Sequence, residues 1–470
     1  MRTQRYRAIA DELAAAIRAG TLAPGTRLPT HRDLARDRGV ALATAGKVYA
    51  ELSAAGLVAG EPGRGMFVRD QSGYGGLDTR RLPLGTRVAD LSFNQPLAAH
   101  QGNQLRQALR DLAAVGSLDA LLAQQPPGGR ERDRAAVATY LLSHQIDVPP
   151  ANVLITGGAQ HGLDVALSAI TSPGQVVAVD TLTYPGIKLV AATRHIELAA
   201  IHCYASGSDL DDLEALCNQR RVSAIYLMPT VHNPLGSVIT ASDRDRVVAI
   251  ARKRDCVILE DGTYAFLDPR APQPLQARAP ERTVYTAGLS KNVATGLRFG
   301  FLVAPDHLIP AITRALRASS WGTPGLVAAL ATRWLRDGTV ADLETDRRAD
   351  ARRRQTIAAH ELTAPGLDYT SHPTAYSGWL RLPAEARSDH VAHLLANEGI
   401  LVSTADAFAV TPHPPNALRL ALANIDESRL AATLRRIREV VLQATHEPDE
   451  IRFRLGSDIV TDHGWGKAGR

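Results

Sequence analysis

The chain has 470 residues, which is too long for one small domain and predicts two or three domains. Hydrophobic residues make up 45% and charged residues 21%, and no apolar run approaches the roughly 20 residues that span a bilayer. The first residues lack the apolar segment of a signal peptide, and three scattered cysteines are too few for a disulfide framework. We therefore expect a cytoplasmic protein with no membrane span and no metal site.

Positive charge is concentrated near the N-terminus. The whole chain carries a net charge of +5, and residues 1–70 contain eleven Arg or Lys against seven Asp or Glu. A basic module attracts the phosphate backbone of nucleic acids because binding releases the condensed counterions. An excess of positive charge is also typical of a solvated surface, so the choice between the two interpretations depends on the predicted secondary structure.

The elements predicted in residues 1–70 are those of a small DNA-binding domain, which we call the head. Apolar residues recur at helical spacing before Gly20, Thr30 is a candidate N-cap, and Gly39 separates two helices. A turn rich in Gly and Pro then joins two short β-type segments. The expected elements are helices at 6–19, 31–38 and 42–55 and strands at 56–59 and 66–68. This order predicts a winged helix-turn-helix whose third helix enters the major groove.

Two segments of the head resemble the GntR family of bacterial regulators. They are residues 28–35, Leu-Pro-Thr-His-Arg-Asp-Leu-Ala, and the wing at 60–68. The family often has Ser-Arg at the start of the recognition helix, where this chain has Ala41 and Leu42. Base contacts are therefore expected elsewhere, and arginines beside the second helix are expected to hold phosphates. The candidate DNA-binding residues are Arg32, Thr44, Lys47 and Arg64.

Composition predicts three further segments after the head. Residues 71–88 are small and polar with interspersed Arg, Pro and Gly, which is typical of a linker. Residues 89–446 alternate between apolar β-type runs and helical stretches, and we call them the body. Residues 447–470 form a tail in which 451–455 alternates like a strand, and we assign this tail no role.

The body is predicted to be an α/β domain with a mostly parallel sheet. Helical stretches such as 246–254 separate its apolar runs, and this alternation is typical of parallel strands that are buried on both faces. The runs that read as buried strands are 153–155, 176–179, 224–227 and 256–259. Ligands of such domains gather at the carboxyl ends of the strands.

Polar residues at these strand ends have the order and spacing of a site for pyridoxal 5'-phosphate (PLP). The cofactor needs a lysine for its Schiff base, a carboxylate for its pyridine nitrogen, and donors for its phenolic oxygen. Lys291 is the catalytic candidate, because it follows a predicted strand at 283–286. Asp261 closes the strand at 256–260, and Tyr264 follows it by three residues.

The remaining candidates would hold the phosphate, the ring and a substrate. An arginine and a helix N-terminus are suited to the phosphate, an aromatic ring can cover the cofactor, and a second arginine can grip an amino-acid carboxylate. The further candidates for the cofactor are Asn233, Arg298, Tyr184, Gly158, Ala159, Gln160 and Ser290, and the candidate for the substrate is Arg419.

These residues resemble those of fold type I aminotransferases across nearly all of 89–446, and the fusion of head and body resembles the MocR subfamily of GntR regulators. The resemblance implies a PLP-bound, head-to-tail homodimer on paired DNA half-sites and a smaller C-terminal α+β lobe. Two positions depart from the aminotransferase pattern. Gly288 stands where a phosphate-holding Ser is usual, for which Ser290 or Thr286 could substitute, and Gln124 stands near the place of a Tyr that reaches the partner's phosphate.

Three functions fit this sequence. The first is a transcription regulator in which an amine or amino acid reacts with PLP on Lys291 and thereby changes operator binding on double-stranded DNA. The alternative is a PLP-dependent aminotransferase acting on an amino acid, with a secondary head. The third is a scaffold that holds no PLP and only dimerises the heads. We favour the regulator, because a DNA-reading head has no use on a metabolic enzyme.

Overall fold

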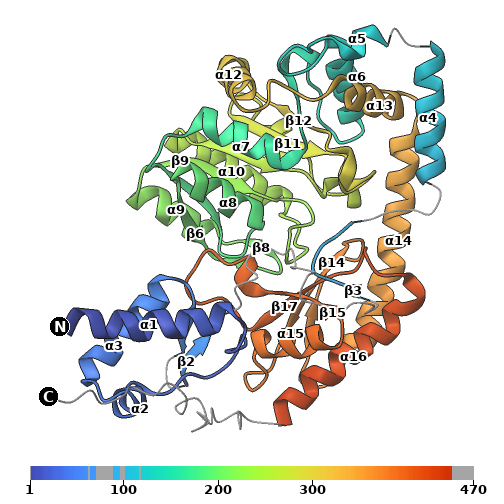
Figure 1. Cartoon of the computed structure of the whole chain (residues 1–470). Helices are drawn as coiled ribbons and strands as arrows, with labels where there is room; N and C mark the ends of the chain where they lie inside the picture. The colour runs from blue at the N-terminus through green and yellow to red at the C-terminus, as the bar shows by residue number, and fades with distance from the viewer. Residues whose placement is uncertain (1, 62–63, 70–87, 96–100, 116–117, 447–470) are drawn as a thin grey trace, which may run out of the picture. The chain divides into compact units, whose positions relative to one another are not determined.

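The computed structural model describes residues 2–61, 64–69, 88–95, 101–115 and 118–446. Residues 71–87 of the predicted linker at 71–88, the turn at 62–63 and the tail at 447–470 lie outside the described residues. The chain divides into two compact units (Figure 1). The first takes its described residues from Met1–Gly73, Ala384–Leu394 and Val440–Arg470, and the second from Tyr74–Pro383 and Leu395–Glu439. The domain bounds given above stay a prediction.

The head contains three helices and a two-stranded antiparallel wing, in the predicted order. Its elements are α1 (Arg2–Arg18), α2 (His31–Asp37), α3 (Leu42–Ala54), β1 (Val58–Glu61) and β2 (Gly65–Val68). Thr30 is the N-cap of α2, and its hydroxyl accepts a hydrogen bond of 3.2 Å from the backbone N–H of Asp33. The first strand begins two residues later than expected, because residues 55–57 form a turn that includes Gly56 at a φ of +69°.

The core of the head is formed by the inner faces of its helices. Ile9, Leu13 and Ile17 of α1 are buried together with Val48 and Leu52 of α3. These residues recur at spacings of four along each helix, so each helix presents one apolar stripe to the other. The packing fixes α3, the predicted recognition helix, against α1.

The second unit is built on a seven-stranded sheet. Six strands are parallel, and only β12 runs against its neighbours β11 and β4. In spatial order the strands are β4 (Val153–Thr156), β12 (Gly300–Val303), β11 (Thr283–Gly288), β10 (Val257–Asp261), β9 (Val222–Leu227), β5 (Val176–Asp180) and β6 (Glu197–Ile201). The predicted mostly parallel sheet is confirmed, and each of the four strands predicted as buried is present.

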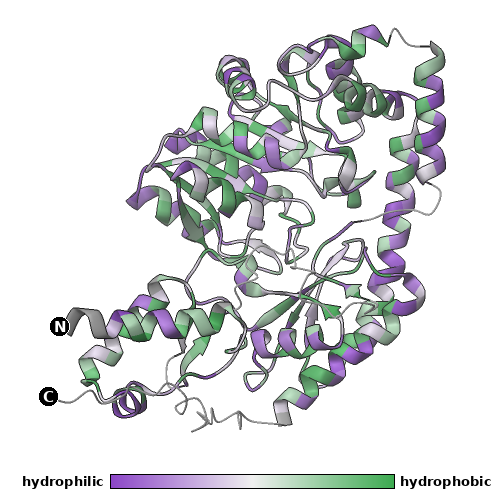
Figure 2. Ribbon diagram, viewed as in Figure 1, coloured by the Kyte–Doolittle hydropathy of each residue, from purple (hydrophilic) through white to green (hydrophobic). Residues whose placement is uncertain are grey.

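Helices cover both faces of this sheet (Figure 1). We call the face covered by α7 (Ala159–Ile170), α8 (Pro185–Arg194) and α12 (Ile309–Ser319) the front. The other face is the rear, and its helices are α6 (Glu131–Leu142), α9 (Leu210–Gln219), α10 (Ala241–Arg254), α11 (Leu275–Arg278), α13 (Gly325–Arg336) and α14 (Thr339–Leu362). The strands are mostly apolar, as Figure 2 shows, because both faces are buried.

Successive residues of each strand point to opposite faces. Tyr226, Leu259 and Val284 pack in the front core, whereas Ile258 and Tyr285 pack in the rear cores. Asp261, two residues after Leu259, therefore faces the front.

A smaller α+β region completes the body. Its antiparallel sheet contains, in order, β13 (Asp368–Thr370), β14 (Ser377–Arg381), β17 (Ala417–Ala421) and β16 (Ser403–Thr404). A parallel pair joins β3 (Ala89–Asp90) to β15 (Ile400–Leu401). The remaining elements of the described chain, which do not all belong to this smaller region, are α4 (Gln101–Val115), α5 (Asp119–Leu122), β7 (Cys203–Tyr204), β8 (Gly207–Ser208), α15 (Ser388–Asn397), α16 (Glu427–His446) and the short 3-10 turns Pro150–Asn152, Ala265–Leu267, Thr295–Leu297, Asp306–Leu308 and Ala405–Ala407. Among the helices of the described ranges, none combines the length and apolar content needed to cross a membrane.

One helix starts earlier than the sequence suggested. The stretch 246–254 is the end of α10, which begins at Ala241. Thr240 caps it, since the threonine hydroxyl accepts a hydrogen bond of 3.2 Å from the backbone N–H of Asp243. The cap lies in a polar stretch without apolar periodicity, and hydrophobic spacing alone therefore places the start too late.

Candidate functional site

The predicted cofactor residues meet at the carboxyl edge of the seven-stranded sheet. Asp261 is the last residue of β10, and Lys291 follows the neighbouring strand β11 by three residues. Gly158 follows β4 and is the N-cap of α7. Because the carboxyl ends of parallel strands share one edge, the three positions come together from distant parts of the chain.

Lys291 is held in an enclosed position. Its Nζ donates a hydrogen bond of 2.8 Å to the carbonyl of Asn94 and lies 4.1 Å from the ring centroid of Phe93. Burial, together with the positive charges of Arg419 and Arg298, lowers the pKa of the Lys291 ammonium to about 7. A lysine in this environment has a substantial neutral fraction near neutral pH, which is the form that attacks a carbonyl carbon.

Asp261 is a buried carboxylate without a cationic side-chain partner among the described residues. Its Oδ2 accepts a hydrogen bond of 2.9 Å from the hydroxyl of Tyr226, and its Oδ1 accepts one of 2.9 Å from the backbone N–H of Thr263. Burial raises the pKa of Asp261, and these two hydrogen bonds oppose the rise. A protonated pyridine nitrogen is a cation of the kind that such a carboxylate needs, so Asp261 fits PLP.

The N-terminus of α7 forms a cradle suited to an anion. Gly158 has a φ of +97°, and a Cβ placed on it would come within 2.9 Å of Nη2 of Arg298. The Arg298 guanidinium is exposed and donates a hydrogen bond of 3.2 Å to the carbonyl of Gly157. Ala159 is the first residue of α7, where backbone N–H groups have no partner inside the helix. Guanidinium and helix N-terminus together suit a phosphate.

Two hydroxyls beside the cradle are available to a phosphate. The buried Oγ of Ser290 and the buried Oγ1 of Thr286 form no hydrogen bond with any described residue. Gly288 has no room for a side chain, since a Cβ there would lie 2.8 Å from the carbonyl oxygen of Phe299. The tight packing around Gly288 therefore explains why this position has no side chain. The free hydroxyls of Ser290 and Thr286 fit the prediction that one of them holds the phosphate in place of a serine at position 288.

The other predicted cofactor residues lie around the same edge. Asn233 and Tyr264 are buried, and Tyr184 is half-buried at the N-cap of α8. Burial raises the pKa of the Tyr184 hydroxyl, and the nearby charges of Asp261 and Tyr264 raise it further. Gln160 donates a hydrogen bond of 3.0 Å to the carbonyl of Gly186, which holds the start of α7 against α8. The roles of these residues stay predictions.

Arg419 lies in the interior on β17. It is 6% exposed, its Nη2 donates a hydrogen bond of 2.8 Å to the carbonyl of Ser92, and its guanidinium carbon lies 5.0 Å from the Phe408 ring. Burial lowers its pKa to about 10. Its buried Nε has no hydrogen-bond partner among the described residues. Arg419 thus presents a largely desolvated positive charge, which suits a carboxylate ligand.

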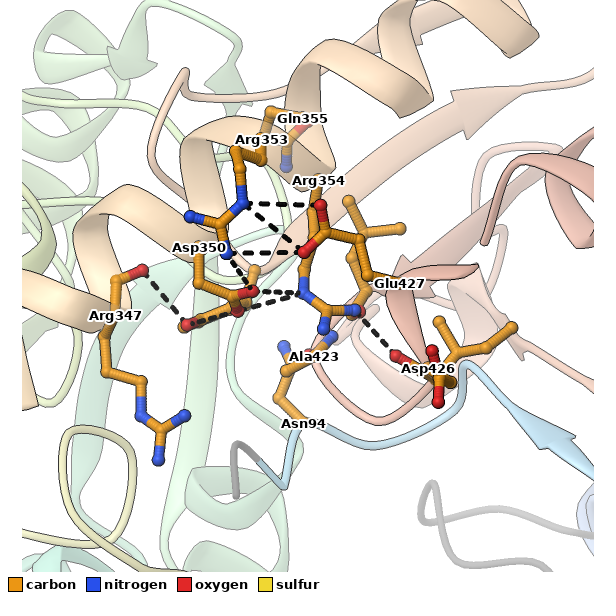
Figure 3. A network of polar contacts seen from close by, with 12 residues as sticks. Asn94, Arg347, Asp350, Arg353, Arg354, Gln355, Ala423, Asp426 and Glu427 are labelled. Atoms are coloured by element: carbon orange, nitrogen blue, oxygen red, sulfur yellow. Dashed lines mark hydrogen bonds and ion pairs between the residues drawn. The ribbon is translucent and has the colours of Figure 1, made fainter. Parts of the chain in front are cut away.

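Sequence reasoning missed the segment Ser92–Asn94, which contacts both Lys291 and Arg419. A polar network centred on Asp350 and Arg354 lies beside Asn94 (Figure 3). Arg354 donates hydrogen bonds to the carbonyls of Leu422 (2.8 Å) and Ile425 (2.7 Å). Ala423, which directly follows Leu422, donates its backbone N–H to Oδ1 of Asn94 at 3.3 Å. No periodicity or motif marks 92–94, so the sequence carried no signal for it.

A buried acid–base pair was also missed. His232 Nε2 lies 3.3 Å from Oδ2 of Asp180, and both side chains are at most 4% exposed. Asp180 ends β5 and His232 precedes Asn233, so the pair stands beside the predicted site. The signal that could have found it is a carboxylate at the end of a buried strand.

The head places its candidate DNA contacts on α2, α3 and the wing. Arg32 and Lys47 are exposed, Thr44 is half-buried, and the exposed Arg64 directly precedes β2. Arg38, the residue directly after α2, forms two hydrogen bonds with Glu12, of 2.9 and 2.7 Å, so an ion pair inside the head already engages this arginine.

The start of α2 is also tied to α3, because the Tyr49 hydroxyl donates a hydrogen bond of 2.6 Å to the carbonyl of Pro29. The Tyr49 ring also packs edge-on against His31, with ring centroids 4.9 Å apart. These contacts fix the geometry of the helix-turn-helix.

Comparison with known proteins matches both parts of the chain. Residues 86–437 match the model for aminotransferase class I and II, and residues 5–68 match the model for bacterial regulatory proteins of the gntR family. YdeF of Bacillus subtilis, an uncharacterized HTH-type transcriptional regulator, is 26% identical over 89% of this chain and 90% of its own length. The HTH-type transcriptional regulator TauR of Rhodobacter capsulatus is 28% identical over 90% of this chain and 93% of its own length.

The body also resembles solved aminotransferase structures. LysN, the alpha-aminoadipate aminotransferase of Thermus thermophilus complexed with N-(5'-phosphopyridoxyl)-L-leucine, has a TM-score of 0.70 and 23% identity. The match covers 75% of this chain and 92% of that structure. At this identity the likeness shows a shared fold.

Proposed function

Because the chain belongs to the aminotransferase class I and II family and also carries a gntR-family domain, as MocR regulators do, we propose that it regulates transcription in response to PLP chemistry. Lys291 and Asp261 carry this proposal. One is an enclosed amine with a pKa lowered to about 7, and the other is a buried carboxylate for which the described residues provide no cationic partner. Both stand at the carboxyl edge of a fold that is joined to a DNA-reading head.

The residues at this edge would hold PLP by three of its parts. Asp261 would pair with the pyridine nitrogen, and Tyr264 and Asn233 would donate to the phenolic oxygen. Arg298, Ser290 and the N-terminus of α7 would hold the phosphate. When bound, the cofactor supplies an electrophilic aldehyde carbon and a ring that withdraws electrons.

Lys291 and Arg419 would act on the effector. Nζ of Lys291 would hold the cofactor covalently, and as a free amine it would accept or return a proton beside the effector. Arg419 lies in the interior with its charge largely desolvated, so it would bind the carboxylate of an amino-acid effector and orient its amine toward Lys291. A simple amine would lack this anchor.

The head would read DNA through α3 and the wing. Arg32 would contact phosphates, while Thr44 and Lys47 on α3 and Arg64 in the wing would lie where base edges are read. We further propose a head-to-tail homodimer on paired half-sites, acting in the cytoplasm. Effector binding would shift the population between an arrangement that binds the operator well and one that binds it poorly.

The test is an operator-binding titration with the full chain. Fluorescently labelled DNA from the regions upstream of neighbouring genes is titrated with PLP-loaded protein, with and without candidate amines and amino acids. We expect a specific site whose affinity changes with the effector, and no effector response in Lys291→Ala. Absence of any specific site, or an identical response in Lys291→Ala, would overturn the proposal.

A further inference from the structure

A cavity of about 240 Å³ lies in the second unit, apart from the predicted PLP site. Its walls come from α14, from the turn after α6 and from residues 265–274. The titratable side chains that line it are Glu344, Arg348, His144, Asp268 and Tyr285. Since a water molecule takes up about 30 Å³ of liquid, the space matches about eight waters or one small organic molecule.

The register of the sheet separates this cavity from the cofactor residues. On β10 and β11, Glu260 pairs with Tyr285 and Asp261 pairs with Thr286. Paired residues point to the same face and successive residues to opposite faces. Asp261 faces the front of the sheet, so Tyr285, which lines the cavity, faces the rear.

Glu344 presents a buried acceptor to the cavity. It is 5% exposed, and its Oε1 accepts hydrogen bonds from the Tyr140 hydroxyl at 2.5 Å and from Nδ2 of Asn292 at 2.7 Å. Its Oε2 accepts no hydrogen bond from any described residue and has only two charge contacts, with Nη1 of Arg348 at 3.9 Å and Nε2 of His144 at 4.0 Å. This carboxylate oxygen lines the cavity and is free to accept a hydrogen bond from a ligand.

The neighbouring groups leave this acceptor available to a ligand. Both terminal nitrogens of Arg348 are already engaged, with the carbonyl of Phe266 and the hydroxyl of Thr345, each at 2.9 Å. The Tyr285 side chain is 2% exposed, and within the described part of the chain its hydroxyl has no hydrogen-bond partner. The lining therefore offers a carboxylate oxygen and a hydroxyl to one ligand group.

The charge and polarity of the lining define the class of ligand. Glu344, Asp268, Arg348 and His144 line the cavity, and Asp268 also lies 3.6 Å from Nε2 of His372. Counting only Asp, Glu and Arg, the lining carries one net negative charge, so the walls favour a positive charge. The rest of the lining is largely apolar, with Ala265, Phe266, Pro269, Ala271, Pro272 and Pro274. We propose that this cavity binds a small organic ammonium ion. Its N–H group donates to Oε2 of Glu344, and its short aliphatic part packs on the apolar wall.

The cavity is connected to the PLP site through two backbone neighbours. Asn292, which donates to Glu344, directly follows Lys291. Gly262, which directly follows Asp261, packs so closely on the Tyr285 hydroxyl that it has no room for a Cβ. A ligand that moves Glu344 or Tyr285 therefore acts on Lys291 or Asp261. This coupling rests on the proposed function, whereas binding in the cavity does not.

Binding is tested with a probe that cannot react at the PLP site. N,N-dimethylbutylamine is a tertiary ammonium ion and cannot condense with an aldehyde, and butanoate is an anion with the same short chain. Isothermal titration calorimetry of the full PLP-loaded chain should show binding of the amine and none of butanoate. Glu344→Gln keeps the shape and one acceptor but removes the charge, and it should weaken binding at least tenfold.

Further variants keep the test decisive. Ala341→Phe fills the cavity from an exposed helix position and should abolish binding even if Glu344→Gln fails to fold. Glu361→Gln, on the same helix but outside the cavity, should bind as the parent does. Lys291→Ala should still bind the probe, with an affinity that differs from the parent's only by the coupling between the two sites, because the cavity does not need the cofactor. Loss of binding in Lys291→Ala, unchanged binding in Ala341→Phe, or no binding to the parent chain would each overturn the proposal.

Discussion

The hydroxyl of Tyr226 donates a hydrogen bond of 2.9 Å to Oδ2 of Asp261, across two neighbouring strands of the sheet. Tyr226 pairs with Leu259, two residues before Asp261, so the two side chains share the front face. Burial alone would favour the neutral form of Asp261, and the hydrogen bond stabilises the charged form instead. Tyr226 would therefore prepare Asp261 for its proposed role of holding a positively charged ring nitrogen.

Replacing Tyr226 by Phe should weaken PLP binding about tenfold or more. The substitution keeps the ring but removes a hydrogen bond to a charged group, which contributes about 1.5–3 kcal/mol, where 1.4 kcal/mol corresponds to a factor of ten. An absorbance titration of the cofactor-free chain with PLP measures the change. Tyr369→Phe is the control, because that hydroxyl donates to Gln355 on another part of the body. Parent-like affinity in Tyr226→Phe would exclude this role.

The attachment of PLP to Lys291 should depend on pH with a midpoint near 7. Burial and two nearby arginines lower the pKa of Lys291 to about 7, so the neutral, reactive fraction grows as the pH rises through this value. We expect the rate of covalent attachment to rise about tenfold from pH 6 to pH 8 and then to level off. Stopped-flow absorbance records the rate, and borohydride reduction followed by peptide mass spectrometry identifies the residue. A rate that continues to rise toward pH 10 would show an ordinary exposed lysine.

The parts of the fold and of the site that the sequence predicts correctly are those with a local pattern in the sequence. The four buried strands were recognised because each is a short apolar run, and Asp261 and Lys291 because each follows such a run. Parallel strands bring their carboxyl ends to one edge, so spacing along the chain was enough to place these residues near each other. The head was recognised in the same way, from helical spacing and the cap at Thr30.

Long-range partners could not be predicted in this way. Asn94 contacts Lys291 across 197 residues, and Glu344 contacts Asn292 across 52. Neither contact leaves a periodic pattern in the sequence, because each depends on where a loop or helix packs in the finished fold. The same holds for Gly288, whose lack of a side chain is explained only by the carbonyl of Phe299 beside it.

Arg419→Lys should separate amino-acid effectors from simple amines. Lysine retains the charge but loses the planar pair of donors that holds a carboxylate. The response of operator binding to alanine should weaken by about 10- to 100-fold, since hydrogen bonds to charged groups contribute about 1.5–3 kcal/mol. The response to ethylamine, which is alanine without its carboxylate, should stay within a factor of two. If both responses fall equally, Arg419 supports the fold or the cofactor and does not read the carboxylate.

Arg32 and Arg36 provide a matched pair of variants on the head, since both are exposed and lie one turn apart on α2. Arg36 donates to Asp33 at 2.7 Å, whereas Arg32 has no ion-pair partner among the described residues. If Arg32 binds a phosphate, Arg32→Ala should weaken binding on specific and unrelated DNA alike. The slope of log affinity against log salt should then fall by about one. Arg36→Ala should change this slope much less, because its charge is already compensated. Fluorescence anisotropy between low and moderate salt measures both slopes, and equal slopes for the two variants would show that Arg32 makes no phosphate contact.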